Sequence, residues 1–255
     1  MKCKFVVAIV SHGHYDFIAL NESLKKIALL SEVEIIIKDN LGQSQLELFT
    51  RENNMTYLNC DNSKGFGENN NEIYEYANSI GLLDPDDWFL VVNPDVYIEL
   101  EYFQLLINQL TDANKHFYAP SLFRDEQYSL HENSLRHFAK VTDLLNPLLL
   151  KPINKAYKKD TLENEAVIDW GSGAFLCIRS EKFDQAGGFD KRYFMYFEDV
   201  DLCQRLKENG VHLRYLKGVK AVHQGQYKNR RLFSKHFVWY VSSLLMFLFA
   251  KRRKH

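Results

Sequence analysis

The alternation of apolar and polar residues predicts a strand, a helix and a second strand at the start of the chain. Short runs of mainly β-branched residues at 4–10 (KFVVAIV) and 33–38 (VEIIIK) have the length and composition of buried strands. Between them, residues 16–30 (DFIALNESLKKIALL) repeat apolar residues at helical spacing. This order predicts two parallel strands joined by a right-handed helical crossover.

The same alternation continues to residue 100. Residues 55–60 (MTYLNC) have the pattern of a third strand, 67–83 that of a helix, and 87–96 (DWFLVVNPDV) that of a buried strand ending in Asn-Pro-Asp. Repeated strand–helix units predict an α/β, Rossmann-like fold with a mixed, mainly parallel central sheet flanked by helices. Ligands of such sheets bind at the carboxyl ends of the strands.

The second half has a less regular pattern. A helix is expected at 100–113 and strands at 116–123 and 212–225. Residues 140–165 are polar and rich in Lys and Asn, and this segment is either a lid or a plain surface loop.

Composition excludes several classes of protein. The chain has 255 residues, enough for a full hydrophobic core, and its net charge of −1 gives no global field that would gather nucleic acid. The first apolar run is too short for a signal peptide and suits a strand. The cysteines form no CxxC pair, so we expect neither a zinc site nor disulfides, and a reducing compartment. They are Cys3, Cys60, Cys177 and Cys203.

Polar residues follow three of the predicted strands. Asp39 and Asn40 end the second, Asn93 and Asp95 follow the strand at 87–92, and His223 ends the last. Because the carboxyl ends of parallel strands lie on one rim, these side chains can meet there. Asp95 and His223 form an oxygen-and-nitrogen pair suited to a divalent cation, although Asn-Pro-Asp is also a common turn.

The loop at 61–72 (DNSKGFGENNNE) precedes a predicted helix and offers backbone N–H groups to an anion. It has neither P-loop nor GxGxxG spacing, so a simple turn remains open. A second glycine-rich stretch, DWGSGAFLCIR, begins at Asp169 and places glycines on both sides of Ser172. Its backbone approaches either a ligand or another strand. Trp170 beside it either stacks on a sugar or fills the core.

Acidic residues open a predicted helix at 198–210 (EDVDLCQRLKENG). Glu198 and Asp199 would be favoured there by the helix dipole alone. The preceding aromatic run at 193–197 (YFMYF) would also desolvate them and raise the pKa of a carboxyl. A carboxylate in that environment is suited to taking a proton from a hydroxyl.

Together these motifs resemble family 2 glycosyltransferases, specifically the bacterial rhamnosyltransferase-like branch, over residues 4–225. The motifs are VSHG, KDN, NSKGFGENNNE, VVNPDV, the block from WGSGAF to CQRLKENG, and AVHQG. The resemblance implies a GT-A fold and inverting transfer of a sugar from a nucleotide-diphosphate donor, usually with Mg²⁺ or Mn²⁺. It implies a domain at 1–225, with a nucleotide-binding half at 1–100 and an acceptor-binding half at 101–225.

The resemblance also assigns roles to single residues. Asp199, with Glu198 beside it, matches the motif that supplies the catalytic base, and Asp95 and His223 match metal ligands. The residues that match donor contacts are Ser11, Asp39, Asn40, Lys64, Gly65, Asn69, Asn93 and Asp95. Apart from the resemblance, we expect the aromatic residues before Glu198 to receive the acceptor sugar, and we assign Trp170, Gly171, Ser172, Gly173 and Tyr196 to the acceptor. Two positions depart from the family: Asn93 replaces an acid, and SHGH replaces an aromatic residue and Asn.

The tail at 226–255 has basic residues on both sides of a mostly apolar run at 237–250. That run is shorter than the roughly 20 residues needed to span a bilayer. It suits a helix lying in an anionic membrane interface. The alternative is a helix packed on the domain or on a second copy in a homodimer.

We therefore expect a glycosyltransferase peripheral to the inner face of the cell membrane, without a nucleic-acid partner. Its best donor is dTDP-rhamnose, and its acceptor a lipid-linked glycan of an O-antigen, capsule or related polysaccharide. UDP-galactose and UDP-glucose are alternative donors. Asn93 favours another alternative, a catalytically inactive nucleotide-sugar-binding scaffold subunit. A nucleotidyltransferase would share the sheet and the metal but would leave the acidic helix start unexplained.

Overall fold

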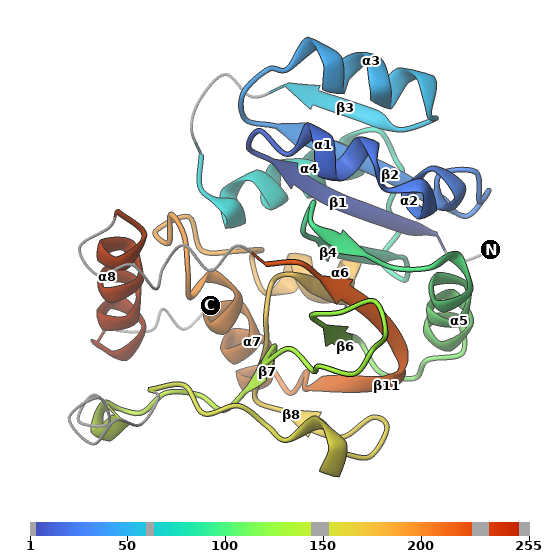
Figure 1. The fold of residues 1–255 in the computed structure, drawn as a ribbon. Helices are drawn as coiled ribbons and strands as arrows, with labels where there is room; N and C mark the ends of the chain where they lie inside the picture. Colours follow the sequence, from blue (N-terminus) through green and yellow to red (C-terminus); the bar gives the residue numbers. More distant parts are fainter. Residues whose placement is uncertain (1–3, 60–63, 144–152, 226–234, 250–255) are drawn as a thin grey trace.

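A nine-stranded sheet forms the centre of the protein (Figure 1). The computed structural model describes residues 4–59, 64–143, 153–225 and 235–249. In spatial order the strands are β3 (Thr56–Asn59), β2 (Val33–Asp39), β1 (Phe5–Ser11), β4 (Trp88–Val92), β10 (Phe175–Arg179), β6 (Phe117–Phe123), β11 (Leu213–His223) and β5 (Val96–Tyr97), with β8 (Val167–Ile168) paired to β11. A second, two-stranded sheet consists of β7 (Leu135–Arg136) and β9 (Trp170–Gly171).

Strand directions place the predicted polar residues on one rim. Strands β1 to β4 pair in parallel, β10 is antiparallel to both β4 and β6, and β11 is parallel to β6. Because β10 is antiparallel to both β4 and β6, these two strands run in the same direction, and β11 runs with them. The prediction of a mixed, mainly parallel sheet is therefore confirmed, and β2, β4 and β11 end on the same side.

Helices cover both faces of the sheet, because strand side chains alternate between them. In β1, Val6 and Ala8 pack on one face while Val7 and Ile9 pack on the other. The first face is covered by α4 (Phe66–Ser79), α6 (Ser180–Gln185) and α7 (Glu198–Glu208). The second is covered by α1 (Tyr15–Ala19), α2 (Glu22–Ile27), α3 (Ser44–Glu52) and α5 (Leu100–Thr111), and a short 3₁₀ turn, η2, spans Lys159–Thr161.

The helix pattern at 16–30 gave a wrong expectation, because the structure divides this segment into α1 and α2. The division lies at Asn21, whose side-chain oxygen accepts a hydrogen bond from Leu24 N (3.0 Å) and caps α2. Its amide nitrogen donates to the carbonyl of Val96 (3.3 Å), a residue distant in the sequence, and this bond holds Asn21 between the two helices. Helix α3 was not predicted.

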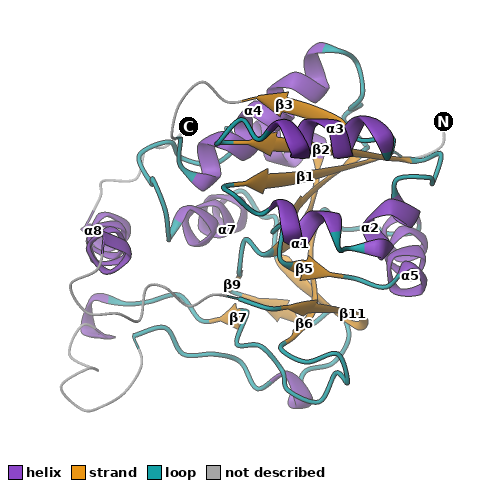
Figure 2. Ribbon diagram, turned by 45° about the horizontal axis from the view of Figure 1, so that its top comes forward, coloured by secondary structure: helices purple, strands orange, loops and turns teal. Residues whose placement is uncertain are grey.

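The tail contains a helix, α8 (Lys235–Phe249), which lies at the edge of the protein beside the start of α7 (Figure 2). Leu244 and Phe247 are buried against the domain, whereas Val238, Leu245 and Phe249 are exposed. Among the helices of the described residues, none is long and apolar enough to cross a membrane. The domain boundary at 225 stays a prediction.

Two other expectations fall partly on residues outside the described ranges. Residues 144–152 of the segment considered as a lid are among them, so that interpretation stays open. Cys3 and Cys60 are also outside, while Cys177 and Cys203 are buried free thiols.

Candidate active site

The rim brings together Asp95 and His223, which are 128 positions apart in the sequence. Strand β5 pairs with the end of β11 so that Val96 lies opposite His223, and Asp95 is next to that pair. The Oδ1 atom of Asp95 is 3.3 Å from Nε2 of His223. The amide nitrogen of Asn93 lies 3.5 Å from the same imidazole nitrogen.

A buried carboxylate holds the other side of the His223 ring. Oε2 of Glu132 is 2.9 Å from Nδ1 of His223, and Glu132 is 7% exposed. Burial alone would lower the pKa of His223, but the hydrogen bonds and charges of Asp95 and Glu132 raise it to about 10. Burial likewise opposes ionisation of Asp95, yet His223 leaves the pKa of that carboxyl lowered.

A buried lysine completes this cluster. Lys159 is 4% exposed and donates hydrogen bonds to Ser134 Oγ (2.8 Å) and to the carbonyl of Leu122 (3.0 Å). Burial lowers the pKa of Lys159 to about 7, against the opposing charge of Glu132. Sequence analysis missed Glu132 and Lys159, because no periodic pattern or motif marks either position.

The donor atoms at this point fit a divalent cation that also binds a substrate. Asp95 contributes a carboxylate oxygen, and His223 contributes Nε2 once a cation has displaced the proton from that nitrogen, while the bond to Glu132 orients the ring. Across the described ranges, no three His, Cys, Asp or Glu side chains are grouped to hold a metal ion. Two protein ligands would leave coordination positions for phosphate oxygens and water, as is usual for Mg²⁺.

Asp39, the last residue of β2, holds the turn that follows this strand. The buried carboxylate of Asp39 accepts hydrogen bonds from the backbone N–H groups of Leu41 (3.0 Å) and Gln43 (2.5 Å) and from the hydroxyl of Tyr57 (3.1 Å). Ser11 is buried beside it in the paired strand β1.

Asn40 follows directly and carries a feature that suits ligand binding. Its backbone N–H donates to the carbonyl of Ser11 (2.9 Å), but its side-chain Oδ1 is buried without a hydrogen-bond partner among the described residues. A buried acceptor of this kind needs a partner.

The glycine-rich loop is described from Lys64 onward. The side chain of Lys64 contacts Glu72, which also pairs with Lys38 at 2.6 Å. The amide nitrogen of Asn69 donates to the carbonyls of Lys64 (3.0 Å) and Gly65 (2.8 Å), and its Oδ1 is buried without a partner in the described part of the chain. The loop leads into α4, and the single negative charge of Glu72 balances one of the two positive charges of Lys38 and Lys64.

Glu198 and Asp199 begin α7, as predicted. The carboxylate of Asp199 accepts hydrogen bonds from the backbone N–H groups of Gly173 (2.9 Å) and Val200 (2.8 Å). Gly173 allows this approach, since a Cβ there would lie 3.0 Å from the Phe66 ring and 3.5 Å from Asp199 Cβ. Glu198 is 6% exposed, and its Oε2 has no hydrogen-bond partner within the described residues.

The surroundings of the two acids oppose ionisation to different extents. Burial raises the pKa of Asp199, but its two backbone hydrogen bonds favour the ionised form. Burial and the neighbouring charge of Asp199 together raise the pKa of Glu198 well above its usual range. Of the two carboxyl groups, Glu198 is therefore the one whose surroundings favour the protonated form more strongly.

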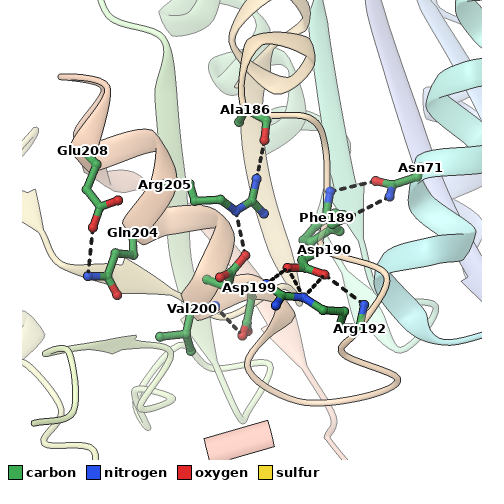
Figure 3. A network of polar contacts seen from close by, with 11 residues as sticks. Asn71, Ala186, Phe189, Asp190, Arg192, Asp199, Val200, Gln204, Arg205 and Glu208 are labelled. Carbon is green, nitrogen blue, oxygen red and sulfur yellow. Dashed lines mark hydrogen bonds and ion pairs between the residues drawn. The ribbon is translucent and has the colours of Figure 1, made fainter. Parts of the chain in front are cut away.

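Polar contacts hold α7 against the rest of the domain (Figure 3). Arg205 donates to the carbonyl of Ala186, outside the helix. Arg205 is itself held by Asp201, one turn earlier in α7, at 2.7 Å. The side chain of Asn71, on α4, donates to the carbonyl of Phe189 and accepts from its N–H, both at 2.8 Å. These contacts join α4 to the segment that leads into α7.

The residues assigned to the acceptor have varied surroundings. Trp170 is 7% exposed and donates its indole N–H to the carbonyl of His137 (3.0 Å). Gly171 packs against the side chain of Leu213, and a Cβ added at Gly171 would lie 3.0 Å from that side chain. Ser172 donates its backbone N–H to Ser134 (2.8 Å). Their contacts with an acceptor, like that of Tyr196, stay predictions.

Comparison with curated proteins identifies rhamnosyltransferases as relatives of this chain. The chain is 34% identical over 251 residues to rhamnosyltransferase WbbL of Escherichia coli (strain K12), covering 96% of this chain and 93% of WbbL. It is 28% identical to an N-acetylglucosaminyl-diphospho-decaprenol L-rhamnosyltransferase of Mycobacterium tuberculosis (strain ATCC 25618 / H37Rv), covering 90% of this chain and 79% of the relative. No protein-family model matches the sequence.

Solved structures show the same fold at low sequence identity. GalNAc-T7 with UDP, GalNAc and Mn²⁺ has a TM-score of 0.63 at 12% identity, covering 95% of this chain and 47% of that one. Residues 1–349 of S. aureus TarS with UDP-GlcNAc have a TM-score of 0.61 at 17% identity, covering 92% and 64%. This chain thus spans between about half and two thirds of those structures. Because WbbL is 34% identical over nearly the whole of both chains, and the fold is that of GT-A glycosyltransferases, this enzyme belongs to the rhamnosyltransferase-like branch of family 2 glycosyltransferases.

Proposed function

We propose that the enzyme transfers rhamnose from dTDP-rhamnose, with inversion, to a hydroxyl group of a lipid-linked cell-surface glycan. The observation that carries this proposal is the environment of Asp199, a desolvated carboxylate held by two backbone N–H groups at the start of α7. The relatives support the substrate class, since WbbL is a rhamnosyltransferase and the mycobacterial relative is named for a diphospho-decaprenol acceptor.

Asp199 acts as the general base in this proposal. As the acceptor oxygen forms its bond to the anomeric carbon, its proton passes to Asp199, and the bond from that carbon to the diphosphate breaks with its electron pair on dTDP. Burial raises the pKa of Asp199, which makes it a stronger base than an exposed aspartate. The raised pKa of Glu198 favours its neutral form, which adds no negative charge beside the base.

Asp95 and His223 would hold Mg²⁺ or Mn²⁺ in this proposal. When bound, the cation supplies positive charge to the leaving diphosphate. Glu132 keeps Nε2 of His223 directed toward Asp95 through its contact with Nδ1. The amide oxygens of Asn40 and Asn69, which have no hydrogen-bond partner among the described residues, lie in the two segments assigned to the nucleotide and are its proposed hydrogen-bond acceptors.

The helix α8 is the proposed membrane contact. Val238, Leu245 and Phe249 are exposed on it, at 61%, 43% and 61%. In the sequence, basic residues lie on both sides of the helix, including KRRK at 251–254. An apolar helix face with basic flanks suits an anionic lipid surface. Replacing all three exposed residues with Ser should lower co-sedimentation with anionic vesicles, and unchanged binding would contradict this contact.

The test of function is a donor panel with a polyprenyl-diphosphate-linked sugar acceptor and Mn²⁺. dTDP-rhamnose should give a glycosylated product and free dTDP, and the new linkage should have the opposite anomeric configuration to the donor. UDP-glucose and UDP-galactose are the competing donors, because the TarS and GalNAc-T7 structures contain UDP compounds. Product with a UDP-hexose alone would replace the proposed donor, and retained configuration would contradict the role of Asp199.

A further inference from the structure

Residues 194–197, which we term the aromatic turn, connect directly to the acidic start of α7. Tyr196 and Phe197 have φ angles of 69° and 66°, in the left-handed region that side chains other than glycine rarely adopt. Two such residues in succession persist only where surrounding contacts hold them. Since Phe197 is the N-cap of α7, the conformation of this turn sets the position of Glu198 and Asp199.

Helix α8 supplies polar contacts to this turn. The hydroxyl of Tyr196 hydrogen-bonds with Nδ1 of His236 at 3.0 Å. Ser243 donates its hydroxyl to the carbonyl oxygen of Met195, also at 3.0 Å. Both bonds join α8 to positions immediately before Phe197.

Aromatic packing extends the same contact along α8. The ring centroids of Phe194 and Trp239 are 4.8 Å apart. Phe197 packs between Tyr240 at 5.5 Å and Phe247 at 5.6 Å. Every residue of the aromatic turn therefore contacts α8 through a ring or a hydrogen bond.

The opposite side of the turn contacts the glycine-rich loop. The N–H of Phe66 donates to the carbonyl of Phe194 at 3.2 Å. Gly65 lies so close to Phe194 that its position has no space for a Cβ atom. The turn is thus enclosed between the start of α4 and the tail helix.

We propose that α8 is a positioning element of the catalytic site, which holds the aromatic turn in its left-handed conformation and thereby aims the carboxylate of Asp199. His236 and Ser243 are the positioning residues. The inference rests on the proposed role of Asp199 as base. It adds that α8 is required for catalysis in the absence of a membrane, so that movement of this helix at a lipid surface would change activity.

The test compares two adjacent serines of α8. Ser243→Ala removes the hydrogen bond to the turn, whereas Ser242→Ala changes an exposed side chain of the same helix. His236→Ala is made alone and together with Ser243→Ala, and the double variant removes both polar contacts. His236→Asn, combined with native Ser243, offers a side-chain oxygen near the position of Nδ1 and serves as the conservative variant.

Full-length proteins are assayed with dTDP-rhamnose, Mn²⁺ and a short-chain, water-soluble sugar diphosphate acceptor without lipid. The double variant should lose at least tenfold in kcat. Ser242→Ala should match the wild type, and His236→Asn should recover most of the activity lost in His236→Ala. Amide hydrogen exchange at residues 194–200 should increase in the double variant while exchange in β1 and β4 remains unchanged.

Equal kcat and equal exchange in the double variant and Ser242→Ala would overturn the inference. A general rise in exchange across the sheet would also overturn it, since it would assign α8 to overall stability alone. If the wild type shows no transfer from dTDP-rhamnose, the proposed donor fails, and the exchange measurement alone decides whether α8 holds the turn.

Discussion

Replacing Asp199 with Asn removes the proposed base while keeping the side-chain shape. Loss of a positioned general base lowers the rate by about 10²–10⁴-fold, which corresponds to roughly 3–5 kcal/mol in the barrier. We therefore expect kcat to fall by at least 100-fold, with donor affinity changed by less than about threefold because Asp95 and His223 are untouched.

The same substitution has a predictable effect on stability. The two oxygens of Asp199 accept from Gly173 and Val200, and an Asn can present only one oxygen to these two donors. An unsatisfied buried donor costs about 1–3 kcal/mol. Removing a desolvated negative charge offsets part of that cost, since burial raises the pKa of Asp199. The net fall in Tm should be a few degrees, on the basis of about 2–4 °C per kcal/mol in a domain of this size.

The assay measures single-turnover transfer, donor binding by calorimetry and thermal unfolding for each variant. Asp201→Asn is the matched control, because it lies on the same helix and pairs with Arg205 at 2.7 Å. It should retain activity within about threefold, since an ion pair of this kind contributes mainly to stability. Retention of more than about a tenth of wild-type kcat in Asp199→Asn would refute the base assignment, given the 100-fold minimum expected for a general base.

Three further variants test other parts of the site. Glu198→Gln should remove a pH dependence of stability, because a raised folded-state pKa gives stability that is present below the unfolded pKa and lost as pH rises through the folded pKa. The difference in Tm between pH 5 and pH 8 should therefore be smaller in the variant than in the wild type. An unchanged difference would show that Glu198 is ionised. Glu132→Gln should weaken Mn²⁺ binding about 10–100-fold by calorimetry, as loss of a residue that orients a ligand does, while equal affinity would leave His223 without a positioning partner. Gly65→Ala should cost about 1–3 kcal/mol in the free energy of unfolding, because its Cβ would collide with Phe194. Gly218→Ala is the control and should have little effect, since no atom lies within 4 Å of its added Cβ. Equal costs for the two variants would contradict the close packing at Gly65.

Periodicity predicted the parts of the fold that depend on local pattern. The buried runs that became β1, β2 and β4 are short and β-branched, so their strand form followed from composition and length. The meeting of Asp95 with His223 could be expected from strand direction alone, because both follow strands that end on one rim. The acidic start of α7 was likewise visible as two acids before a helical pattern.

Features that depend on contacts across the chain could not be predicted in this way. The break at Asn21 results from a local cap combined with a bond to Val96 in a distant segment. Glu132 acquires its role only when β11 brings His223 beside it. The docking of α8 on the aromatic turn depends on side chains such as Tyr196 and His236, which no spacing rule connects.

The most direct test of the central claim is transfer from dTDP-rhamnose to a polyprenyl-diphosphate-linked sugar by the purified wild-type protein. The account predicts a rhamnosylated product, one dTDP released for each sugar transferred, and inversion at the anomeric carbon. Absence of any product from dTDP-rhamnose under conditions in which another nucleotide sugar is transferred would contradict the proposed donor.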